Sequence, residues 1–329
     1  MFVPIDPPAT RPYQGMRRSA IKPWIDIQEL PKHLANVLPF LLGTVLAYWE
    51  AGSVNWPVFW VALVALYFLT NGTYIGNEYF DYENDRANTT RIGGSDKVGV
   101  TTTGGTRVLV KGLIPRRHAL VASIVCFILA VPFGLYLQYG VGTGPLTIPL
   151  GAVALFIGWF YTAPPIRASY RGLGELFIAI GQGLVIFGAY YVQQGFSMLP
   201  IVASLSWFVA LPALKIIREF PDYEADRSTE KRGLTIIFGR ERMARVYGIM
   251  IVVAIALFIP VFLMLDSLLA MIILVPAALL GRSAFITLSG QWRDPAKMET
   301  AAVSAFTGML LIPLALMIVF LIGAFRRWG

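Results

Sequence analysis

The sequence predicts an all-α integral membrane protein that crosses the bilayer about nine times. Of its 329 residues, 56% are hydrophobic and 14% are charged, whereas an ordinary soluble domain carries roughly 25% charged residues. A water-soluble enzyme of this length needs far more polar surface, and a disordered chain contains far fewer apolar residues, so both classes are excluded. Cys126 is the single cysteine, which rules out an intramolecular disulfide and a cysteine-built zinc site.

Nine apolar segments account for the predicted spans, each of which needs about 20 mostly apolar residues. The fourth segment is short. In chain order the segments cover residues 34–49, 57–80, 118–138, 146–160, 173–193, 198–217, 243–264, 267–288 and 302–325.

Residues 1–33 form an N-terminal segment, and residues 34–329 form a single transmembrane domain. The N-terminal segment lacks the apolar core of a cleavable signal peptide. Its last part mixes apolar side chains with lysines, which predicts a short interfacial helix before the first span. The side chains that make this pattern are Lys22, Trp24, Ile25, Ile27, Leu30 and Lys32.

Basic residues concentrate in alternate loops, and the loops between them contain none. This alternation follows the positive-inside rule, so we expect the N-terminus and the long loops to be cytoplasmic and the C-terminus to lie outside. The net charge of +8 is therefore a topology signal, and we expect no nucleic-acid partner. The segments that contain 25 of the 27 lysines and arginines are 1–33, 81–117, 161–172, 215–245 and 282–300.

Two matching acidic stretches follow the second and sixth predicted spans. The first is NEYFDYENDR (77–86) and the second is REFPDYEADR (218–227). Six of the ten positions are identical, and the stretches are 141 residues apart. The repetition indicates two related halves, each with an acidic helix end at the same membrane face.

The spacing of the acids has a physical meaning, because residues at i, i+4 and i+8 share one face of a helix. Asn77, Asp81 and Asp85 line up in the first stretch, and Asp222 and Asp226 line up in the second. Such carboxylates repel each other unless a cation lies between them. Mg²⁺ favours oxygen ligands and binds through a few carboxylates plus a substrate phosphate. We therefore expect these five residues to hold Mg²⁺ around a diphosphate, with the four aspartates catalytic.

The alternative is that both stretches are solvated helix ends with local arginine pairs. The glutamates of the two stretches lie off the aspartate stripe, and we expect them to be solvated or paired with arginine. They are Glu78, Glu83, Glu219 and Glu224.

These residues resemble the acidic motifs of the UbiA superfamily of intramembrane prenyltransferases. The family pattern N-D-x-x-D-x-x-x-D is matched over 77–85, with Glu78 in place of the second Asp, and D-x-x-x-D is matched over 222–226. The resemblance covers most of the chain from about residue 30 onward. It implies the fold of that family, with about nine transmembrane helices around a central cavity and both motifs at the cytoplasmic face.

Within the superfamily, the chain is most similar to the branch that prenylates 1,4-dihydroxy-2-naphthoate on the way to menaquinone. Glu230 and Gly233 depart from the pattern of that branch. The resemblance implies Mg²⁺-dependent transfer of an isoprenoid chain from a prenyl diphosphate to this aromatic acceptor, in contact with membrane lipid. The similar stretches are LPFLLGT (38–44), NEYFDY (77–82), RVLVKGLI (107–114), YRGLGE (170–175) and DRSTEKRGLT (226–235).

The resemblance also implies residues that bind the two substrates. Basic side chains near the diphosphate donate hydrogen bonds to its oxygens, although each is also explained as a topology charge that faces lipid headgroups. Polar and aromatic side chains at or near span ends are candidates for the acceptor or the cavity wall, with headgroup anchoring, packing or helix–helix contact as the alternative. The diphosphate candidates are Arg107, Lys231, Arg232, Lys111 and Arg91. The acceptor or cavity candidates are Lys32, Asn71, Tyr74, Tyr161 and Gln182.

Other functions fit parts of the pattern. A relative with another acceptor, such as 4-hydroxybenzoate or a glycerol phosphate lipid, or a prenyl diphosphate cyclase, would share both motifs. A secondary transporter would share the internal repeat, but transporter sites lie near the bilayer midplane. The acids of this chain lie at one face, which favours the enzyme.

Overall fold

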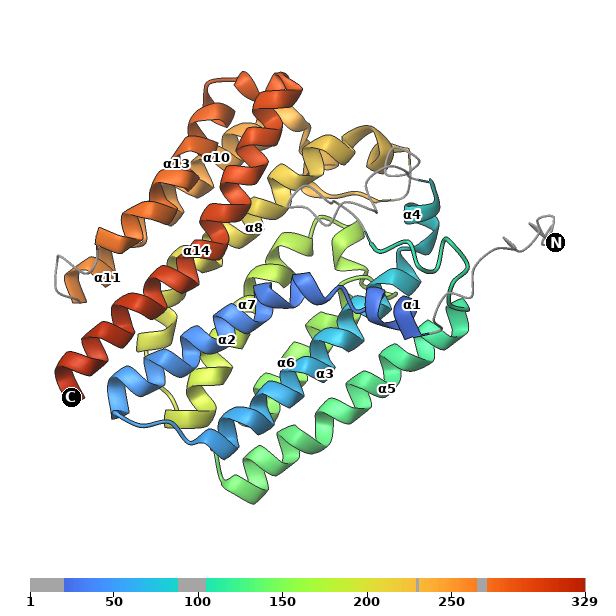
Figure 1. Ribbon diagram of the computed structural model, residues 1–329. Coiled ribbons are helices and arrows are strands. Elements are labelled where there is room, and N and C mark those ends of the chain that lie inside the picture. The colour runs from blue at the N-terminus through green and yellow to red at the C-terminus, as the bar shows by residue number, and fades with distance from the viewer. Residues whose placement is uncertain (1–20, 88–104, 229–230, 265–270, 329) are drawn as a thin grey trace.

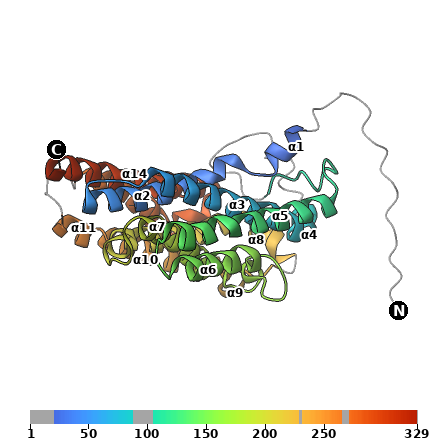
Figure 2. The same cartoon turned by 90° about the horizontal axis from the view of Figure 1, so that it is seen from below.

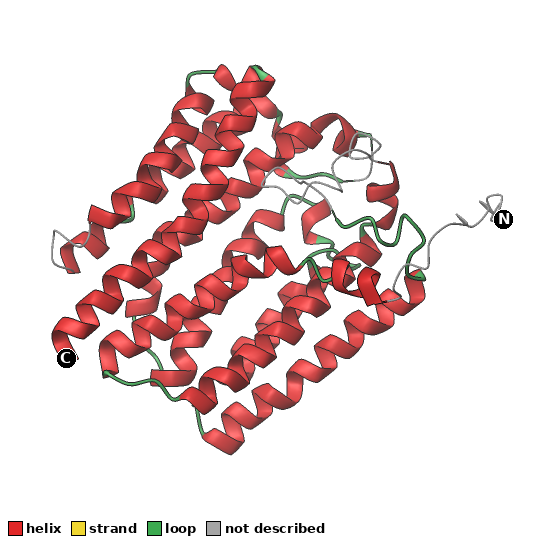
Figure 3. Ribbon diagram, viewed as in Figure 1, coloured by secondary structure: helices red, strands yellow, loops and turns green. Residues whose placement is uncertain are grey.

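The computed structural model describes residues 21–87, 105–228, 231–264 and 271–328, and this part of the chain is helical without a β-strand (Figure 3). Eight of its helices are long and apolar enough to cross a membrane. A ninth apolar helix, α6 (Thr147–Phe160), is shorter. The nine predicted spans thus correspond to eight long helices and one short helix, which is the weak fourth segment.

Most helices begin and end close to the predicted span boundaries, but α8 extends beyond 217 to Arg227 and α14 begins at Pro295, before 302. α5 continues as a π-helical turn to Val141, and α10 is followed by a short separate helix, α11. The bounds are α1 (Ile21–Asp26), α2 (Leu30–Ala51), α3 (Trp56–Phe80), α4 (Tyr82–Ala87), α5 (Arg116–Leu135), α7 (Gly174–Gln194), α8 (Leu199–Arg227), α9 (Leu234–Phe238), α10 (Arg240–Ala256), α11 (Ile259–Met264), α13 (Leu274–Leu288) and α14 (Pro295–Trp328).

The long helices form one bundle in which segments far apart in the sequence are neighbours (Figure 1). α2 packs against both α7 and α14, and α3 packs against α5. α8 contacts α7 and α10, while α13 contacts α10 and α14. The largest buried apolar cluster joins α2, α7, α8, α10, α13 and α14. The helices α3, α5 and α6 lie outside this cluster.

The two ends of the bundle differ in content. α1, α4 and the loops that follow α3 and α6 gather at one end, which we call the motif end, and the C-terminus of α14 lies at the opposite end (Figures 1 and 2). The described chain therefore begins and finishes at opposite ends of the bundle, as an odd number of crossings requires.

Local contacts fix the half of the bundle that carries the first acidic stretch. Asn55 caps α3, since its side chain accepts the N–H of Val58 at 3.2 Å. Further along, α3 approaches α5 closely at Gly76, where an added methyl group would lie 2.8 Å from Ser123 Oγ. Ser123 Oγ also donates to the carbonyl of Gly72 at 2.6 Å. Small residues of this kind let membrane helices pack at short range.

The two acidic stretches are built differently. α8 is one continuous helix through the second stretch, whereas α3 ends at Phe80 and α4 begins at Tyr82. Asp81 lies at this break and still keeps helical spacing, because its N–H donates to the carbonyl of Asn77 at 2.8 Å and its carbonyl accepts from Asp85 at 2.9 Å. The expected single helix is therefore wrong for the first stretch, although the shared face survives the break.

Candidate active site

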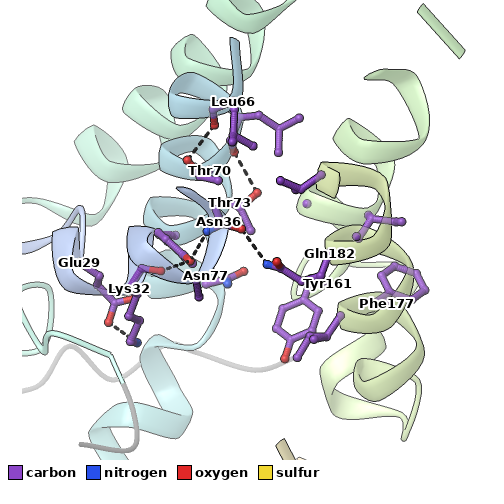
Figure 4. Close-up of a pocket in the computed structure, with 18 of the residues that line it drawn as sticks. Glu29, Lys32, Asn36, Leu66, Thr70, Thr73, Asn77, Tyr161, Phe177 and Gln182 are labelled. Carbon is purple, nitrogen blue, oxygen red and sulfur yellow. Dashed lines mark hydrogen bonds and ion pairs between the residues drawn. The ribbon is translucent and has the colours of Figure 1, made fainter. Parts of the chain in front are cut away.

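A cavity of about 1830 Å³ lies between α2, α3, α6, α7 and α8. Its motif end is lined by acidic and basic side chains from both stretches, and the remainder is lined mainly by apolar side chains. Figure 4 shows part of this wall, where Asn36, Thr73 and Asn77 come from one side and Tyr161, Phe177 and Gln182 from the other. The cavity therefore combines a charged end with an apolar body.

Asn77, Asp81 and Asp85 of the first stretch all line the cavity. Asn77 Oδ1 accepts a hydrogen bond from Thr162 Oγ1 at 2.8 Å, and Asp81 Oδ1 accepts one from the Tyr170 hydroxyl at 2.7 Å. Both donors come from the loop between α6 and α7. These neutral donors orient the side chains without cancelling the negative charge of the aspartate.

The second stretch faces the same space. Arg218, Glu219 and Asp226 line the cavity, and Asp226 is buried. The fifth expected ligand, Asp222, lies within α8, and its side chain falls outside the described part of the structure. The described members of both predicted sets are thus brought to one cavity from residues more than 130 positions apart in the sequence.

Two of the four glutamates differ from the expectation. Glu83 and Glu224 are exposed and pair with Arg116 and Arg240, as expected. Glu78 and Glu219 are instead buried, with 4% and 8% of their surfaces exposed. Neither is solvated: Glu78 accepts the backbone N–H of Thr106 in the loop after the first stretch, and Glu219 accepts that of Thr235 in the first turn of α9.

Basic side chains surround the same end of the cavity. Arg107, Lys111 and Lys231 line it, as do Lys215 and Arg218, which were not among the predicted residues. Lys215 is an intramembrane cation, and that property alone marks a functional candidate. Its ammonium contacts Glu175 Oε1 at 2.7 Å and also pairs with Glu219.

Two predicted diphosphate residues lie elsewhere. Arg232 is exposed and does not line the cavity, and its backbone N–H donates to the carbonyl of Tyr170 at 3.0 Å. Arg91 lies outside the described residues.

A chain of hydrogen bonds runs along the cavity wall next to the charged end. Gln182 Nε2 donates to Asn36 Oδ1 at 2.7 Å, and Asn36 Nδ2 donates to the Tyr74 hydroxyl at 2.7 Å. That hydroxyl donates in turn to the carbonyl of Lys32 at 3.2 Å. The Lys32 ammonium pairs with Glu29 (Figure 4).

Four of the five predicted acceptor or cavity residues therefore line the cavity, namely Lys32, Tyr74, Tyr161 and Gln182. Asn71 does not line it and donates to the carbonyl of Tyr67 at 2.8 Å. Asn36 was missed by sequence reasoning, although it is a polar residue within the first predicted span and carries the same signal as Gln182.

Two tyrosines of the loop after α6, Tyr161 and Tyr170, keep their hydroxyl protons at neutral pH, and Tyr170 donates a hydrogen bond to Asp81. Burial raises the pKa of the Tyr161 hydroxyl. Burial also raises the pKa of Tyr170, and the nearby Asp81 carboxylate raises it further. Both groups therefore keep their protons. Arg167 lies over the Tyr170 ring, with its guanidinium carbon 3.9 Å from the ring centroid.

The donor set suits a hard divalent cation. Within the described residues, no group of three or more His, Cys, Asp or Glu side chains lies close enough together to hold a metal ion. The acids instead face a shared space from two walls, with amide and carboxylate oxygens only. This arrangement fits Mg²⁺, which typically keeps several waters and binds one or two carboxylates plus substrate phosphate.

Comparison with known proteins gives the family. The model of the UbiA prenyltransferase family matches residues 36–310. The chain is 25% identical over 211 residues to 1,4-dihydroxy-2-naphthoate octaprenyltransferase from Bacillus subtilis, which covers 63% of each protein. It is 26% identical over 253 residues to 2-carboxy-1,4-naphthoquinone phytyltransferase from Synechocystis, covering 76% of this chain and 74% of that protein. It is 27% identical to digeranylgeranylglyceryl phosphate synthase from Pyrococcus abyssi, over 80% of this chain and 86% of that protein.

Solved structures share the fold. A structure of a digeranylgeranylglyceryl phosphate synthase superposes with a TM-score of 0.65 at 17% identity and covers 93% of this chain and 99% of that one. A UbiA homologue from Archaeoglobus fulgidus, bound to DMAPP and Mg²⁺, superposes with a TM-score of 0.62 at 16% identity, covering 89% and 98%. The relatives named above are prenyltransferases or synthases of prenylated lipids. The multiple apolar helices of this chain make it an integral, multi-pass membrane protein. The chain belongs to the UbiA prenyltransferase family.

Proposed function

We propose that this protein transfers an isoprenoid chain from a prenyl diphosphate to an aromatic acceptor, with 1,4-dihydroxy-2-naphthoate as that acceptor and Mg²⁺ as the cofactor. One observation carries the proposal: acids and cations from both halves meet at one end of a large cavity whose remainder is apolar. A prenyl diphosphate has the same division, with a charged head and a long apolar tail. The named naphthoate prenyltransferase from Bacillus subtilis supports the choice of acceptor.

The acids have a defined task in this reaction. Asn77, Asp81, Asp85, Asp222 and Asp226 would hold Mg²⁺, which neutralises the diphosphate and so stabilises it as a leaving group. Arg107, Lys111 and Lys231, with Lys215 and Arg218, bind and orient the diphosphate oxygens from the surrounding wall. The allylic carbon–oxygen bond then breaks, and positive charge develops on the allylic carbon.

The deeper wall orients the acceptor. The chain Gln182–Asn36–Tyr74 lies beside the charged end, so its polar groups can hold the ring hydroxyls of the acceptor near the allylic carbon. The electron-rich ring attacks that carbon with an electron pair, and the substituent at the attacked ring carbon leaves, either as a proton or, for a naphthoate, as carbon dioxide. The ring regains its aromaticity in that last step.

We also propose that the motif end faces the cytoplasm, with the N-terminus inside and the C-terminus outside. The concentration of lysine and arginine in the loops of the motif end supports this orientation.

An assay with purified full-length protein tests the proposal. A prenyl diphosphate and Mg²⁺ are combined with each of three acceptors: 1,4-dihydroxy-2-naphthoate, 4-hydroxybenzoate and a prenylated glycerol phosphate. We expect prenylation of the naphthoate alone, and no turnover when EDTA removes the metal. Selective use of the glycerol phosphate would replace the acceptor assignment with the function of the Pyrococcus relative. Diphosphate release with none of the acceptors would overturn the proposed transfer.

A further inference from the structure

Two glutamates occupy the same place in the two acidic stretches. Glu78 and Glu219 are 141 residues apart, and each is the second residue of its stretch. They are buried to 4% and 8% exposure. The other matched pair, Glu83 and Glu224, has side chains that are 70% and 74% exposed. The second position of each stretch is therefore enclosed by the protein, whereas the other matched glutamate faces solvent.

Glu78 contacts the loop that follows the first stretch. Its Oε1 accepts the backbone N–H of Thr106. The neighbouring Gly105 lies directly against the carboxylate, so that an added methyl group at Gly105 would overlap Glu78 and lie 2.9 Å from Asp85 Oδ2. The loop therefore reaches the acidic stretch at a residue without a side chain.

Glu219 makes the equivalent contact in the second half. Its Oε2 accepts the backbone N–H of Thr235 at 3.3 Å. A methyl group added to Gly233 would lie 2.5 Å from Glu219 Oε1 and 2.8 Å from Oε2. A glycine and a threonine N–H thus meet the glutamate in both halves.

The two loops reach this arrangement by different routes. The bonded threonine follows its glutamate by 28 residues in the first half and by 16 residues in the second. Connections of unequal length therefore bring a threonine N–H to the matching glutamate in both halves. The contact is thus not explained simply by one connecting segment having been duplicated with the repeat.

Each loop carries cations that line the cavity. Arg107 and Lys111 follow Thr106, and Lys231 precedes Thr235. The first loop is held on its other side by Val108, Leu109 and Ile114, which are buried against α3, α5 and α1. The hydrogen bonds at Thr106 and Thr235 hold the backbone in place, and they therefore also determine the positions of these three cations.

We propose that Glu78 and Glu219 are paired positioning residues, each of which fastens the loop that follows its own stretch and holds the cations of that loop at the diphosphate end of the cavity. The role in catalysis rests on the proposed function, whereas the role in holding the loop does not. A glutamine keeps the oxygen that accepts the N–H, but it lacks the negative charge of a carboxylate ligand. The proposal therefore distinguishes Glu→Gln from Glu→Ala.

The experiment measures amide hydrogen exchange in the full-length protein, on peptides that cover 105–114 and 231–239, together with the KM for prenyl diphosphate. Glu78→Ala should speed exchange by roughly tenfold in the first loop only, and Glu219→Ala in the second loop only, as expected for the loss of one hydrogen bond. Each change should also raise the KM. Glu78→Gln and Glu219→Gln should stay within about threefold of the unaltered protein in loop exchange, because the accepted hydrogen bond remains.

Two further sets of variants keep the test decisive. Gly105→Ala and Gly233→Ala push the carboxylate away without deleting it, so they should reproduce the exchange of the alanine variants even if Glu219→Ala fails to fold beside Lys215. Glu83→Ala and Glu224→Ala are the matched controls, and neither should change the exchange of the loops.

Two results would overturn the proposal. One is unchanged loop exchange in Glu78→Ala and Gly105→Ala. The other is an equal loss of activity in Glu78→Gln and Glu78→Ala, which would make Glu78 a charged ligand. The exchange data stand even if no acceptor is prenylated, so failure of the proposed function and failure of this inference are separate outcomes.

Discussion

The two halves of the molecule carry nearly the same acidic stretch, but the residues next to the stretch differ between them. At the position three residues before each stretch the first half has Tyr74 and the second has Lys215, and at the first position it has Asn77 where the second has Arg218. All four side chains line the cavity. Asn77 and Asp81 accept hydrogen bonds from the neutral Thr162 and Tyr170, whereas Glu219 of the second stretch pairs with the cation Lys215.

The charge beside the acids therefore differs between the halves. Thr162 and Tyr170 are neutral, so their hydrogen bonds to Asn77 and Asp81 bring no positive charge to the first stretch. Lys215 already balances Glu219 and Glu175, and Arg218 adds a further positive charge to the cavity. The internal repeat has thus kept the pattern of acids, while the residues at the neighbouring positions differ in charge.

The largest expected effect comes from removing an acid of the first stretch. Asp81→Ala should reduce the prenylation rate at least 1000-fold, because loss of charge stabilisation at a developing leaving group costs roughly 100- to 1000-fold for one hydrogen-bond donor and more for a metal ligand. Glu83→Ala, an exposed acid of the same stretch, is the control. Steady-state kinetics on purified variants give the answer, and a near-normal rate for Asp81→Ala would remove the metal role of the first half.

The next effect concerns stability and tests the balance of charge in the second half. Lys215→Met should destabilise the protein by roughly 3–5 kcal/mol, because it leaves two buried carboxylates without their shared cation. Tyr74→Phe at the matching position should cost only about 2 kcal/mol, the usual value of the two hydrogen bonds that its hydroxyl makes with Asn36 and Lys32.

Thermal unfolding of both variants in detergent measures this difference. Equal losses of stability for the two substitutions would show that the matching positions carry similar energetic weight, and the contrast between the halves would then be incorrect.

The smallest effect is expected at the contact between the loop after α6 and the first stretch. Tyr170→Phe removes the donor to Asp81, and we expect a decrease of roughly tenfold in kcat/KM, which corresponds to one hydrogen bond to a charged acceptor. Tyr139→Phe, an exposed tyrosine away from the cavity, should have no effect. Unchanged kinetics in Tyr170→Phe would show that Asp81 is oriented without its neutral donor.

Much of the fold follows from composition alone. Apolar segments of sufficient length predict membrane helices, and the weak fourth segment is also the short helix α6. The break at Asp81 was not predicted, because the residues on both sides favour a helix and the neighbouring loops decide where it ends. Burial of Glu78 and Glu219 was missed for a similar reason: a glutamate near a membrane surface is ordinarily exposed, and only the packing of a distant loop shows otherwise.

The residues of the site divide in the same way. Spacing and repetition placed the acids of both stretches, and the described members of both face one cavity. The spacing of the residues could not predict which lysines and arginines line the cavity. Arg107 and Lys231 line the cavity while Arg232 is exposed, although Lys231 and Arg232 are adjacent in the chain. A side chain in a loop points where the backbone of that loop turns it.

The sequence by itself determined that this chain belongs in a membrane, that an acidic stretch is repeated 141 residues further on, and that the acids of each stretch are spaced four apart. These properties depend on local pattern: apolar length, spacing of four, and repetition at a fixed offset. Only the tertiary structure decided which partners the acids have. The neutral donors Thr162 and Tyr170 and the cation Lys215 reach the two stretches through packing between helices that are distant in sequence, and such contacts have no local signature.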